Sequence, residues 1–189
     1  MQQQPSQFVG PESLREGRPV LPQASPPPRA VSVLQWTVLA GLALLSYFVF
    51  SRLGFQVVEV VGDSMQPTLQ QSDHYLLKKW VYLFRDPRPR EVVVIVDPQD
   101  TGFSVKRIIG QAGDTVELRQ GDVFLNGVRL EEPYLRKGMV TRSWSDAMSQ
   151  VYVVGPDEYF VLGDNREVSV DSRTYGPVPR RNVLGLITP

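Results

Sequence analysis

The chain shows three kinds of hydrophobic pattern in succession. Residues 1–29 are rich in Gln, Pro and Ser, and no regular apolar period runs through them. Residues 30–51 form an apolar run that contains no charged side chain. From residue 52 onward, short apolar stretches rich in β-branched residues are separated by clusters of Gly, Pro, Asn and Asp. This succession predicts a disordered tail, one long helix and a β-rich domain.

The first 29 residues are expected to be disordered, because their composition offers too little apolar surface to offset the entropy lost on ordering. The segment is also too long and too rich in proline to be the short basic start of a secretory signal. It ends in three consecutive prolines followed by Arg29.

The run at residues 30–51 has the length of a membrane-spanning helix. At about 1.5 Å per residue it would span roughly 33 Å, against about 30 Å for the hydrocarbon core of a bilayer. Trp36 and Tyr47 are suited to the two membrane interfaces. A buried core helix and a cleaved signal peptide are alternatives, although no clear small-x-small cleavage site follows the run. The flanking arginines give only a weak positive-inside signal.

The remaining sequence predicts a mainly β domain. Strands are expected at residues 57–61, 75–77, 92–96, 105–109, 115–118, 123–125, 151–154 and 159–162. Asn126-Gly127 between apolar residues indicates a hairpin turn. Many short strands with few helical repeats predict an antiparallel, Greek-key or barrel-like domain behind the N-terminal helix.

Composition narrows the functions that this chain can have. Lys and Arg total 20, Asp and Glu total 20, and the formal net charge is zero. Nucleic acid is therefore not an expected partner, since it usually requires a basic surface. The absence of cysteine excludes disulfides, thiolate catalysis and cysteine-bound zinc. The single histidine, His74, lies in no motif, so we expect neither a Ser-His-Asp triad nor a metal site or other cofactor.

Three segments carry residues suited to catalysis. Ser64 lies in Gly-Asp-Ser-Met-Gln-Pro-Thr-Leu at residues 62–69, and Lys106 lies in Val-Lys-Arg-Ile-Ile-Gly at residues 105–110. The third segment, at residues 163–173, reads Gly-Asp-Asn-Arg-Glu-Val-Ser-Val-Asp-Ser-Arg. A serine hydroxyl needs a base to remove its proton. A lysine amine can be that base if burial lowers its pKa from about 10.4.

Taken alone, each segment has an ordinary structural explanation. Ser64 could be a turn serine bonded to its own backbone, and Lys106 could be a solvated strand lysine. Strand alternation sends Lys106 and Arg107 to opposite faces, so we expect one of them to point inward and the other to stay solvated. An Asp171–Arg173 pair could be an exposed salt bridge that contributes under about 1 kcal/mol.

Together and in this order, the three segments closely resemble those of the bacterial type I signal peptidases, over roughly residues 30–189. The resemblance implies a membrane-anchored serine endopeptidase that removes N-terminal signal peptides from exported preproteins. It implies Ser64 as the nucleophile, Lys106 as the general base and Ser169 as the residue that orients the lysine amine. Asp171 and Arg173 would form a supporting ion pair.

The same resemblance suggests how the substrate is bound. The backbone N–H of Ser64 is the expected oxyanion donor. Some family members have a serine at the position of Gly62, so the second oxyanion donor stays open. An extended peptide would add beside a strand edge, with small side chains in shallow pockets lined by Val60, Met65 and Val105. Ordinary core packing is an equal alternative for these three residues.

The resemblance also implies a location. Residues 1–29 would be a cytoplasmic tail, residues 30–51 a single transmembrane helix of the cell membrane, and residues 52–189 an extracytoplasmic peptidase domain. Signal-peptide-bearing preproteins and the lipid bilayer are then the expected partners. Residues 75–84, which are apolar and aromatic with basic interruptions, could dip into the membrane surface or pack in the core.

Two other functions stay open on the sequence alone. The self-cleaving SOS repressors use the same Ser/Lys dyad on a related β fold, but no DNA-binding helix-turn-helix is visible in this chain. A catalytically inactive, membrane-tethered binding module is the second alternative. The presence of Ser64, Lys106 and Ser169 argues against it.

Overall fold

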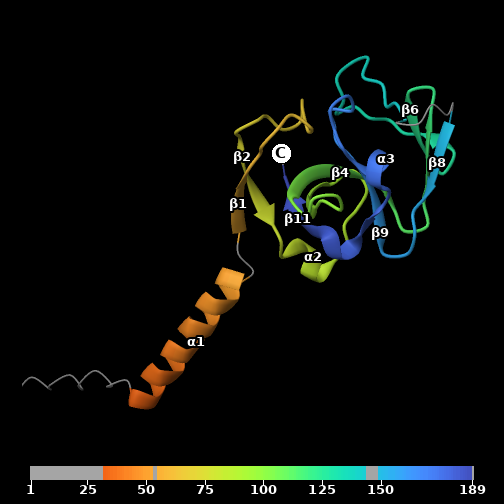
Figure 1. The fold of residues 1–189 in the computed structure, drawn as a ribbon. Coiled ribbons are helices and arrows are strands. Elements are labelled where there is room, and N and C mark those ends of the chain that lie inside the picture. The colour runs from red at the N-terminus through yellow and green to blue at the C-terminus, as the bar shows by residue number, and fades with distance from the viewer. Residues whose placement is uncertain (1–31, 53–54, 144–148, 189) are drawn as a thin grey trace, which may run out of the picture. The chain divides into compact units, whose positions relative to one another are not determined.

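The structure, a computed structural model, describes residues 32–52, 55–143 and 149–188 (Figure 1). The chain divides into two compact units between Leu42 and Ala43. The predicted disordered tail at residues 1–29 lies outside the described residues.

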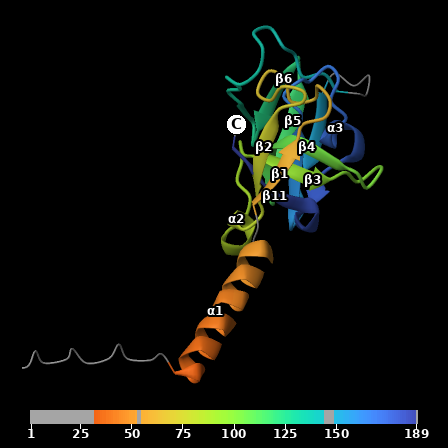
Figure 2. The ribbon, with the colours of Figure 1, turned by 90° about the vertical axis from the view of Figure 1, so that its left-hand side faces the viewer.

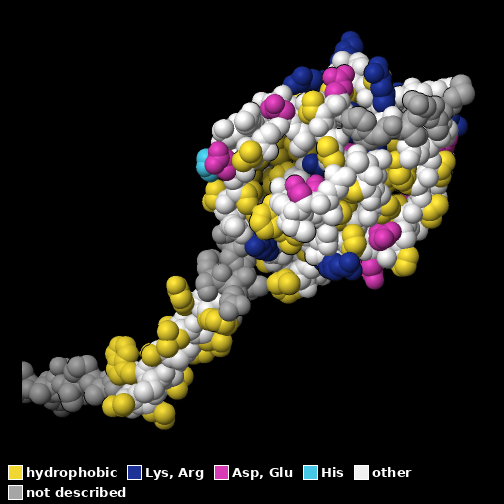
Figure 3. All heavy atoms as spheres, viewed as in Figure 1, with side chains coloured by type: hydrophobic (Ala, Val, Ile, Leu, Met, Phe, Trp, Pro, Cys, Tyr) yellow, Lys and Arg dark blue, Asp and Glu magenta, His cyan; other side chains and the backbone are white. Residues whose placement is uncertain are grey.

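Helix α1 runs from Val33 to Arg52. Ser32 and Gln35 cap its start reciprocally: the Ser32 N–H donates to Gln35 Oε1 at 2.9 Å and the Gln35 N–H donates to Ser32 Oγ at 3.3 Å. Its described side chains are exposed, and Figure 3 shows hydrophobic atoms around it. The helix covers residues 33–51 of the predicted segment at residues 30–51 and extends one residue beyond it, to Arg52; residues 30 and 31 lie outside the described part. No helix among the described residues is long and apolar enough to cross a membrane.

The rest of the described chain is mainly β. Its strands are β1 (Phe55–Glu59), β2 (His74–Lys78), β3 (Val92–Val96), β4 (Phe103–Gln111), β5 (Thr115–Arg119), β6 (Asp122–Leu125), β7 (Val128–Arg129), β8 (Ser149–Val153), β9 (Glu158–Leu162), β10 (Val178–Pro179) and β11 (Val183–Ile187). Short helical segments accompany them: α2 (Val81–Phe84), α3 (Ser172–Tyr175) and the 3₁₀ turn η1 (Arg180–Asn182).

These strands form two antiparallel sheets. One has the order β1-β2-β11-β3-β4-β9-β10 and the other the order β7-β6-β5-β8. The larger sheet curls, as the two perpendicular views show (Figures 1 and 2). It forms a half-barrel that ends at β1 and β10 and does not close. The prediction of a mainly antiparallel β domain is therefore confirmed.

The eight predicted strands correspond to strands of the structure, whereas β7, β10 and β11 were not predicted. The Asn126-Gly127 turn is confirmed: both residues have positive φ, 52° and 79°, and they join β6 to β7. Strand β11 lies between β2 and β3, and its Gly185 interrupts the apolar run. A Cβ at Gly185 would lie 2.7 Å from Leu77 Cδ1 and 3.1 Å from Lys79 Cα, so the glycine permits this close packing.

Apolar side chains gather in three core clusters. The first contains Tyr82, Val93, Ile95, Ile108, Tyr159, Val161, Val178 and Val183. The second contains Val60, Met65, Leu69, Leu77, Val92, Val94 and Ile187. The third contains Ile109, Val116, Leu118, Val123, Val154, Phe160 and Leu162. Strand alternation divides β3 between the first two clusters, so this strand is buried on both faces and reads as a continuous apolar run.

Every residue of these clusters lies after Glu59 in the sequence. We therefore expect a protein that lacks residues 1–52 to keep the β fold. Far-ultraviolet circular dichroism and a cooperative thermal transition, compared with those of the full chain, measure this. An unfolded truncated protein would show that the domain core requires the N-terminal helix.

Candidate active site

Ser64 lies in the turn that follows β1. Met65 and Leu69, each 1% exposed, anchor this turn in the second core cluster, while Ser64 itself is only partly buried. The Ser64 carbonyl accepts the Asn165 N–H at 2.9 Å. The Asn165 side chain also donates to the Asp63 carbonyl at 3.1 Å. The turn is thus fixed from one side by apolar packing and from the other by the 163–173 segment.

Gly62, two residues before Ser64, has a φ of +91°. No atom lies within 4 Å of a Cβ built at this position, so space does not exclude a side chain. The backbone conformation does, because residues with a Cβ rarely adopt it. The second oxyanion donor stays unassigned.

Ser64 also borders a groove of about 530 Å³. The groove is lined by Gln56, Val57, Val58, Glu59, Val60, Val61, Ser64, Met65, Leu77, Lys79, Val94, Phe103, Ser104, Val105 and Leu184. The three predicted pocket residues, Val60, Met65 and Val105, are all in its wall. Val60 and Met65 belong to the second core cluster, and Val105 packs against it. These three residues therefore both line the groove and pack in or against the core.

Two strand edges border this groove. Among the described strands, β1 pairs with β2 alone. Residues 103–106 of β4 pair with β3, and pairing of β4 with β9 begins only at Arg107. The backbone groups on the outer edges of β1 and of this part of β4 are thus free of sheet partners, as binding of an extended peptide requires.

Lys106 is buried on β4, with 3% of its surface exposed. It lies directly opposite Val93 of β3 and two residues before Ile108, so it shares the sheet face of the first core cluster. Burial lowers the pKa of the Lys106 amine. The carboxylates of Asp171 and Asp97 act in the opposite direction and Arg173 adds to the lowering, but the cost of burying a charge dominates.

Arg107 corrects our expectation that one of the two neighbouring cations stays solvated. Its exposed fraction is only 7%. Its guanidinium pairs with Asp164 through Nε–Oδ1 at 2.8 Å and Nη2–Oδ2 at 2.5 Å, and it donates to the Arg90 carbonyl at 2.8 Å. The prediction that Lys106 and Arg107 point to opposite faces was correct, but both faces of β4 are covered, so both side chains are buried.

Asp171 and Arg173 form a buried ion pair, and the alternative of an exposed salt bridge is wrong. Arg173 Nε and Nη2 lie 2.8 and 2.9 Å from the two Asp171 carboxylate oxygens, and both side chains are at most 2% exposed. Arg173 also donates to the Ser169 carbonyl at 3.1 Å, and Asp171 accepts the Gly163 N–H at 3.0 Å. This pair fixes the two ends of the 163–173 segment to each other.

Ser169 is fully buried and lies against Gly163. A Cβ at Gly163 would meet Ser169 Oγ at 2.2 Å and the Ser64 carbonyl oxygen at 2.6 Å. Because Gly163 has no side chain, the backbone just after β9 can pass between Ser64 and Ser169. These two serines are 105 positions apart in the sequence. Ser169 Oγ has no hydrogen-bond partner within the described residues.

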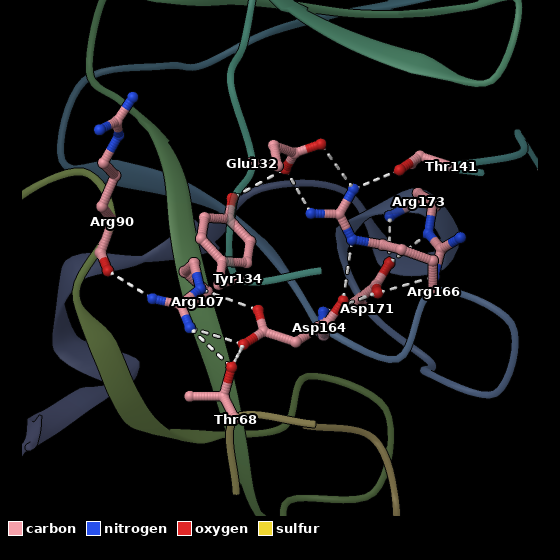
Figure 4. A network of polar contacts seen from close by, with 11 residues as sticks. Thr68, Arg90, Arg107, Glu132, Tyr134, Thr141, Asp164, Arg166, Asp171 and Arg173 are labelled. Atoms are coloured by element: carbon pink, nitrogen blue, oxygen red, sulfur yellow. Dashed lines mark hydrogen bonds and ion pairs between the residues drawn. The ribbon is translucent and has the colours of Figure 1, made fainter. Parts of the chain in front are cut away.

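Figure 4 shows a polar network, of which the sequence analysis predicted the Asp171–Arg173 ion pair but not the other contacts. Arg166, whose side chain is fully buried, pairs with Glu132, donates to Thr141, and donates to the Gly163 carbonyl at 2.9 Å. Glu132 also accepts from the Tyr134 hydroxyl at 2.8 Å. The guanidinium carbon of Arg107 lies 3.9 Å from the centroid of the Tyr134 ring, and the Thr68 hydroxyl donates to the Asp164 carboxylate.

This network joins the Ser64 turn, β4 and the 163–173 segment to residues 130–141, which follow β7. Only the charge and the spacing of Asp164 and Arg166 were visible in the sequence. Nothing there marked Glu132 or Tyr134, because the arginines that they contact, Arg166 and Arg107, lie more than 25 residues away in the sequence.

Two other features singled out from the sequence are His74 and the segment at residues 75–84. His74 is exposed at the start of β2, and among the described residues no group of three or more His, Cys, Asp or Glu side chains is arranged to hold a metal ion. The segment at residues 75–84 is divided: Leu77 and Tyr82 are buried in core clusters, whereas Leu83 and Phe84 are 66% and 79% exposed.

Comparisons with known proteins identify the family of this chain. A family model described as signal peptidase, peptidase S26, matches residues 33–188. Signal peptidase I P of Bacillus subtilis subsp. natto is 32% identical over 161 residues, which cover 82% of this chain and 86% of that protein. Signal peptidase I of Leptolyngbya laminosa is 31% identical over 175 residues, covering 88% of this chain and 83% of that protein.

A crystal structure of a signal peptidase I from Enterococcus faecalis V583 is 30% identical and covers 55% of this chain and 98% of that one, with a TM-score of 0.46. The sequence matches make the protein a peptidase. The chain belongs to the signal peptidase family, peptidase S26, and is an enzyme of the signal peptidase I type. The resemblance expected from the three sequence segments is confirmed.

The Glu132–Arg166 pair predicts a large effect on stability. Glu132→Gln should lower the free energy of unfolding by about 3 kcal/mol, because it leaves the buried Arg166 guanidinium without a compensating charge. Glu131→Gln is the matched control: Glu131 is exposed, so its loss should change stability by less than about 0.5 kcal/mol. Chemical denaturation measures both, and equal stabilities of the two variants would contradict this view of the network.

Proposed function

We propose that this peptidase removes signal peptides from preproteins through a Ser64 nucleophile and a Lys106 general base. One observation carries the proposal: a buried lysine with a lowered pKa lies on the open-edged part of β4 that borders the groove lined by Ser64. The signal peptidase I matches support the class of substrate.

The substrate would bind as an added strand. An extended peptide in the groove pairs its backbone with the free edges of β1 and of residues 103–106. Its alternate side chains face Val60 and Met65, which are buried, and Val105, which is half-buried, and shallow pockets between them would suit small side chains.

The chemistry then follows in two halves. The neutral Lys106 amine takes the Ser64 proton as Oγ attacks the peptide carbonyl carbon, and the Ser64 backbone N–H stabilises the oxyanion. The resulting ammonium gives its proton to the departing amine, which leaves an ester between Ser64 and the signal peptide. Lys106 next takes a proton from water, which attacks the ester, and Ser64 recovers its hydrogen.

The 163–173 segment serves this chemistry by holding its members in place. Ser169 is buried against Gly163, next to the Ser64 carbonyl, and orients the lysine amine. The Asp171–Arg173 pair keeps the Ser169 backbone in position through the bond from Arg173 to the Ser169 carbonyl. Its role is thus positional, and its charges reach Lys106 only through space.

Ser64→Ala and Lys106→Ala should each reduce cleavage by at least about a thousandfold, since nucleophile and base act as a unit. Lys106→Arg should be equally inactive, because a guanidinium remains protonated. The measurement is cleavage of a model preprotein with the cut mapped by mass spectrometry, on variants whose circular dichroism matches that of the unchanged protein. Near-normal turnover in either alanine variant would refute the dyad.

The pH dependence tests the base independently. Only neutral Lys106 accepts the Ser64 proton, so kcat should rise with pH through the Lys106 pKa and level off above it. Since burial lowers that pKa, the midpoint of the rise should lie below the ordinary lysine value of about 10.4. EDTA should leave the rate unchanged; inhibition that zinc reverses would point to a different mechanism.

We further propose that residues 30–51 anchor the enzyme in the cell membrane, with the tail at residues 1–29 in the cytoplasm and the peptidase domain outside. The uncharged run and the exposed apolar side chains of α1 support an anchor. Such an anchor raises the effective concentration of enzyme near substrates in the same bilayer. The protein without residues 1–52 should then cleave a soluble peptide normally but a vesicle-inserted preprotein slowly. Equal rates on the inserted preprotein would exclude this role.

A further inference from the structure

The turn that carries Ser64 contacts the segment that follows β7 through polar side chains that the proposed mechanism does not use. Gln66 Nε2 donates to Asp63 Oδ1 at 2.6 Å, and Gln66 Oε1 accepts from Arg136 Nη2 at 2.8 Å. Asp63 directly precedes Ser64 in the chain. These two hydrogen bonds connect a cation, 70 positions from Gln66 in the sequence, to the residue beside the nucleophile.

On the Ser64 side, Arg136 lies past the end of the groove. The groove wall contains residues 56–61, which precede Ser64, and then Ser64 and Met65. The residue that Arg136 contacts, Gln66, is the next one along the chain. Arg136 also lines a second hollow of about 400 Å³, whose wall comes mainly from residues 129–141. Arg136 thus connects the end of the groove with this second hollow.

On the β4 side, the same segment meets the strand just past the groove. The groove wall contains residues 103–105 of β4. Tyr134 stacks on Arg107, with the guanidinium carbon 3.9 Å from the ring centroid (Figure 4). Side chains two positions apart share a face of the sheet, so Arg107 points to the same face as Val105 of the groove. Both strands that border the groove therefore lead to the segment that carries Arg136.

Arg136 is fixed in this place while its charge stays available. Glu132 of the same segment pairs with the buried Arg166, and Tyr134 packs on β4. Arg136 itself is exposed, and within the described part of the chain it forms no ion pair with a carboxylate. A guanidinium has several N–H donors, of which Gln66 takes one. The others can meet a ligand.

The two sides of a cleavage site differ in chemistry. A signal peptide is apolar and has small residues before the cut, which suits the largely apolar groove. The first residues of the mature protein then leave past Ser64 toward Gln66 and Arg136. We propose that Arg136 is a specificity-determining residue that favours an acidic side chain among the first three residues after the cut. This inference rests on the proposed cleavage of signal peptides.

The charges around Arg136 set the sign and the size of the effect. Its guanidinium is protonated at every working pH. The exposed Lys137 adds to its positive charge, whereas the exposed Asp63 and Glu131 oppose it. The Asp63 carboxylate already accepts a hydrogen bond from Gln66. Since exposed charge pairs are weak and screened by salt, the preference should be modest and should depend on ionic strength.

Model preproteins that carry Glu, Gln or Lys at the first, second or third position after the cut test the inference. At one position or more, kcat/KM should fall in the order Glu, Gln, Lys, with about fivefold between the extremes. The difference should shrink as sodium chloride is raised from about 0.05 M to about 0.5 M. Arg136→Gln should reduce the Glu-to-Lys ratio to below about twofold, and Arg136→Lys should keep most of it, because the charge remains.

Lys137→Gln is the matched control. It removes the same charge from the neighbouring exposed residue, which has no hydrogen bond to the Ser64 turn among the described residues, so the ratio should persist. An unchanged ratio in Arg136→Gln would overturn the proposal. An equal loss in Lys137→Gln would also overturn it, by assigning the preference to the general surface charge. A preference of the unchanged enzyme for Lys would do the same, by assigning the effect to Asp63.

The same substrates separate this inference from the proposed function. If the unchanged enzyme cuts all of them at the expected junction and at equal rates, while Ser64→Ala is inactive, the inference about Arg136 alone fails. If the unchanged enzyme cuts none of them at that junction, the proposed function fails and this inference fails with it. Mass spectrometry of the products locates the cut in each case.

Discussion

The site depends on the burial of two neighbouring cations on opposite faces of β4. Arg107 is compensated by a two-point ion pair with Asp164 and by the Arg90 carbonyl, so it is held as a permanent charge. Lys106 has no such pair, and the acidic groups near it act only through space. The same strand therefore carries one cation that fixes structure and one whose proton is held weakly. Because both faces of β4 are covered and adjacent side chains point to opposite faces, Lys106 and Arg107 are buried in different surroundings.

The arginines that are paired with carboxylates hold in place the segments that surround Lys106. Arg107, Arg166 and Arg173 are each paired with a carboxylate, and these pairs join β4, the 163–173 segment and residues 130–141. Buried ion pairs contribute little net stability compared with apolar packing, but they restrict which partners can meet. Their effect here is geometric. They require Asp164, Asp171 and Ser169 to occupy one arrangement, with Gly163 packed between Ser64 and Ser169.

The sequence predicted the parts of this arrangement that depend on local pattern. The short β-branched runs identified eight strands, the Asn126-Gly127 turn identified a hairpin, and the three motifs identified the family. Strand β11 was missed because its place between β2 and β3 depends on pairing with residues about 90 and 110 positions earlier, of which the pattern of Val183–Ile187 gives no sign. Glu132 and Tyr134 were missed for the same reason. The burial of Arg107 could not be predicted either, since alternation shows which faces two residues take and not whether both faces are covered.

The change of partner along β4 has a consequence for where a bound chain can lie. Up to Lys106 the outer edge of the strand is free, and from Arg107 onward β9 occupies it. A peptide that extends the sheet along this edge meets the end of β9 and can pair no further. Under the proposed binding mode, the enzyme's own β9 limits the length over which a bound strand can pair with β4, irrespective of the side chains of that strand. Selection of a cutting position would then begin with the length of an open edge, and pocket size would only refine it.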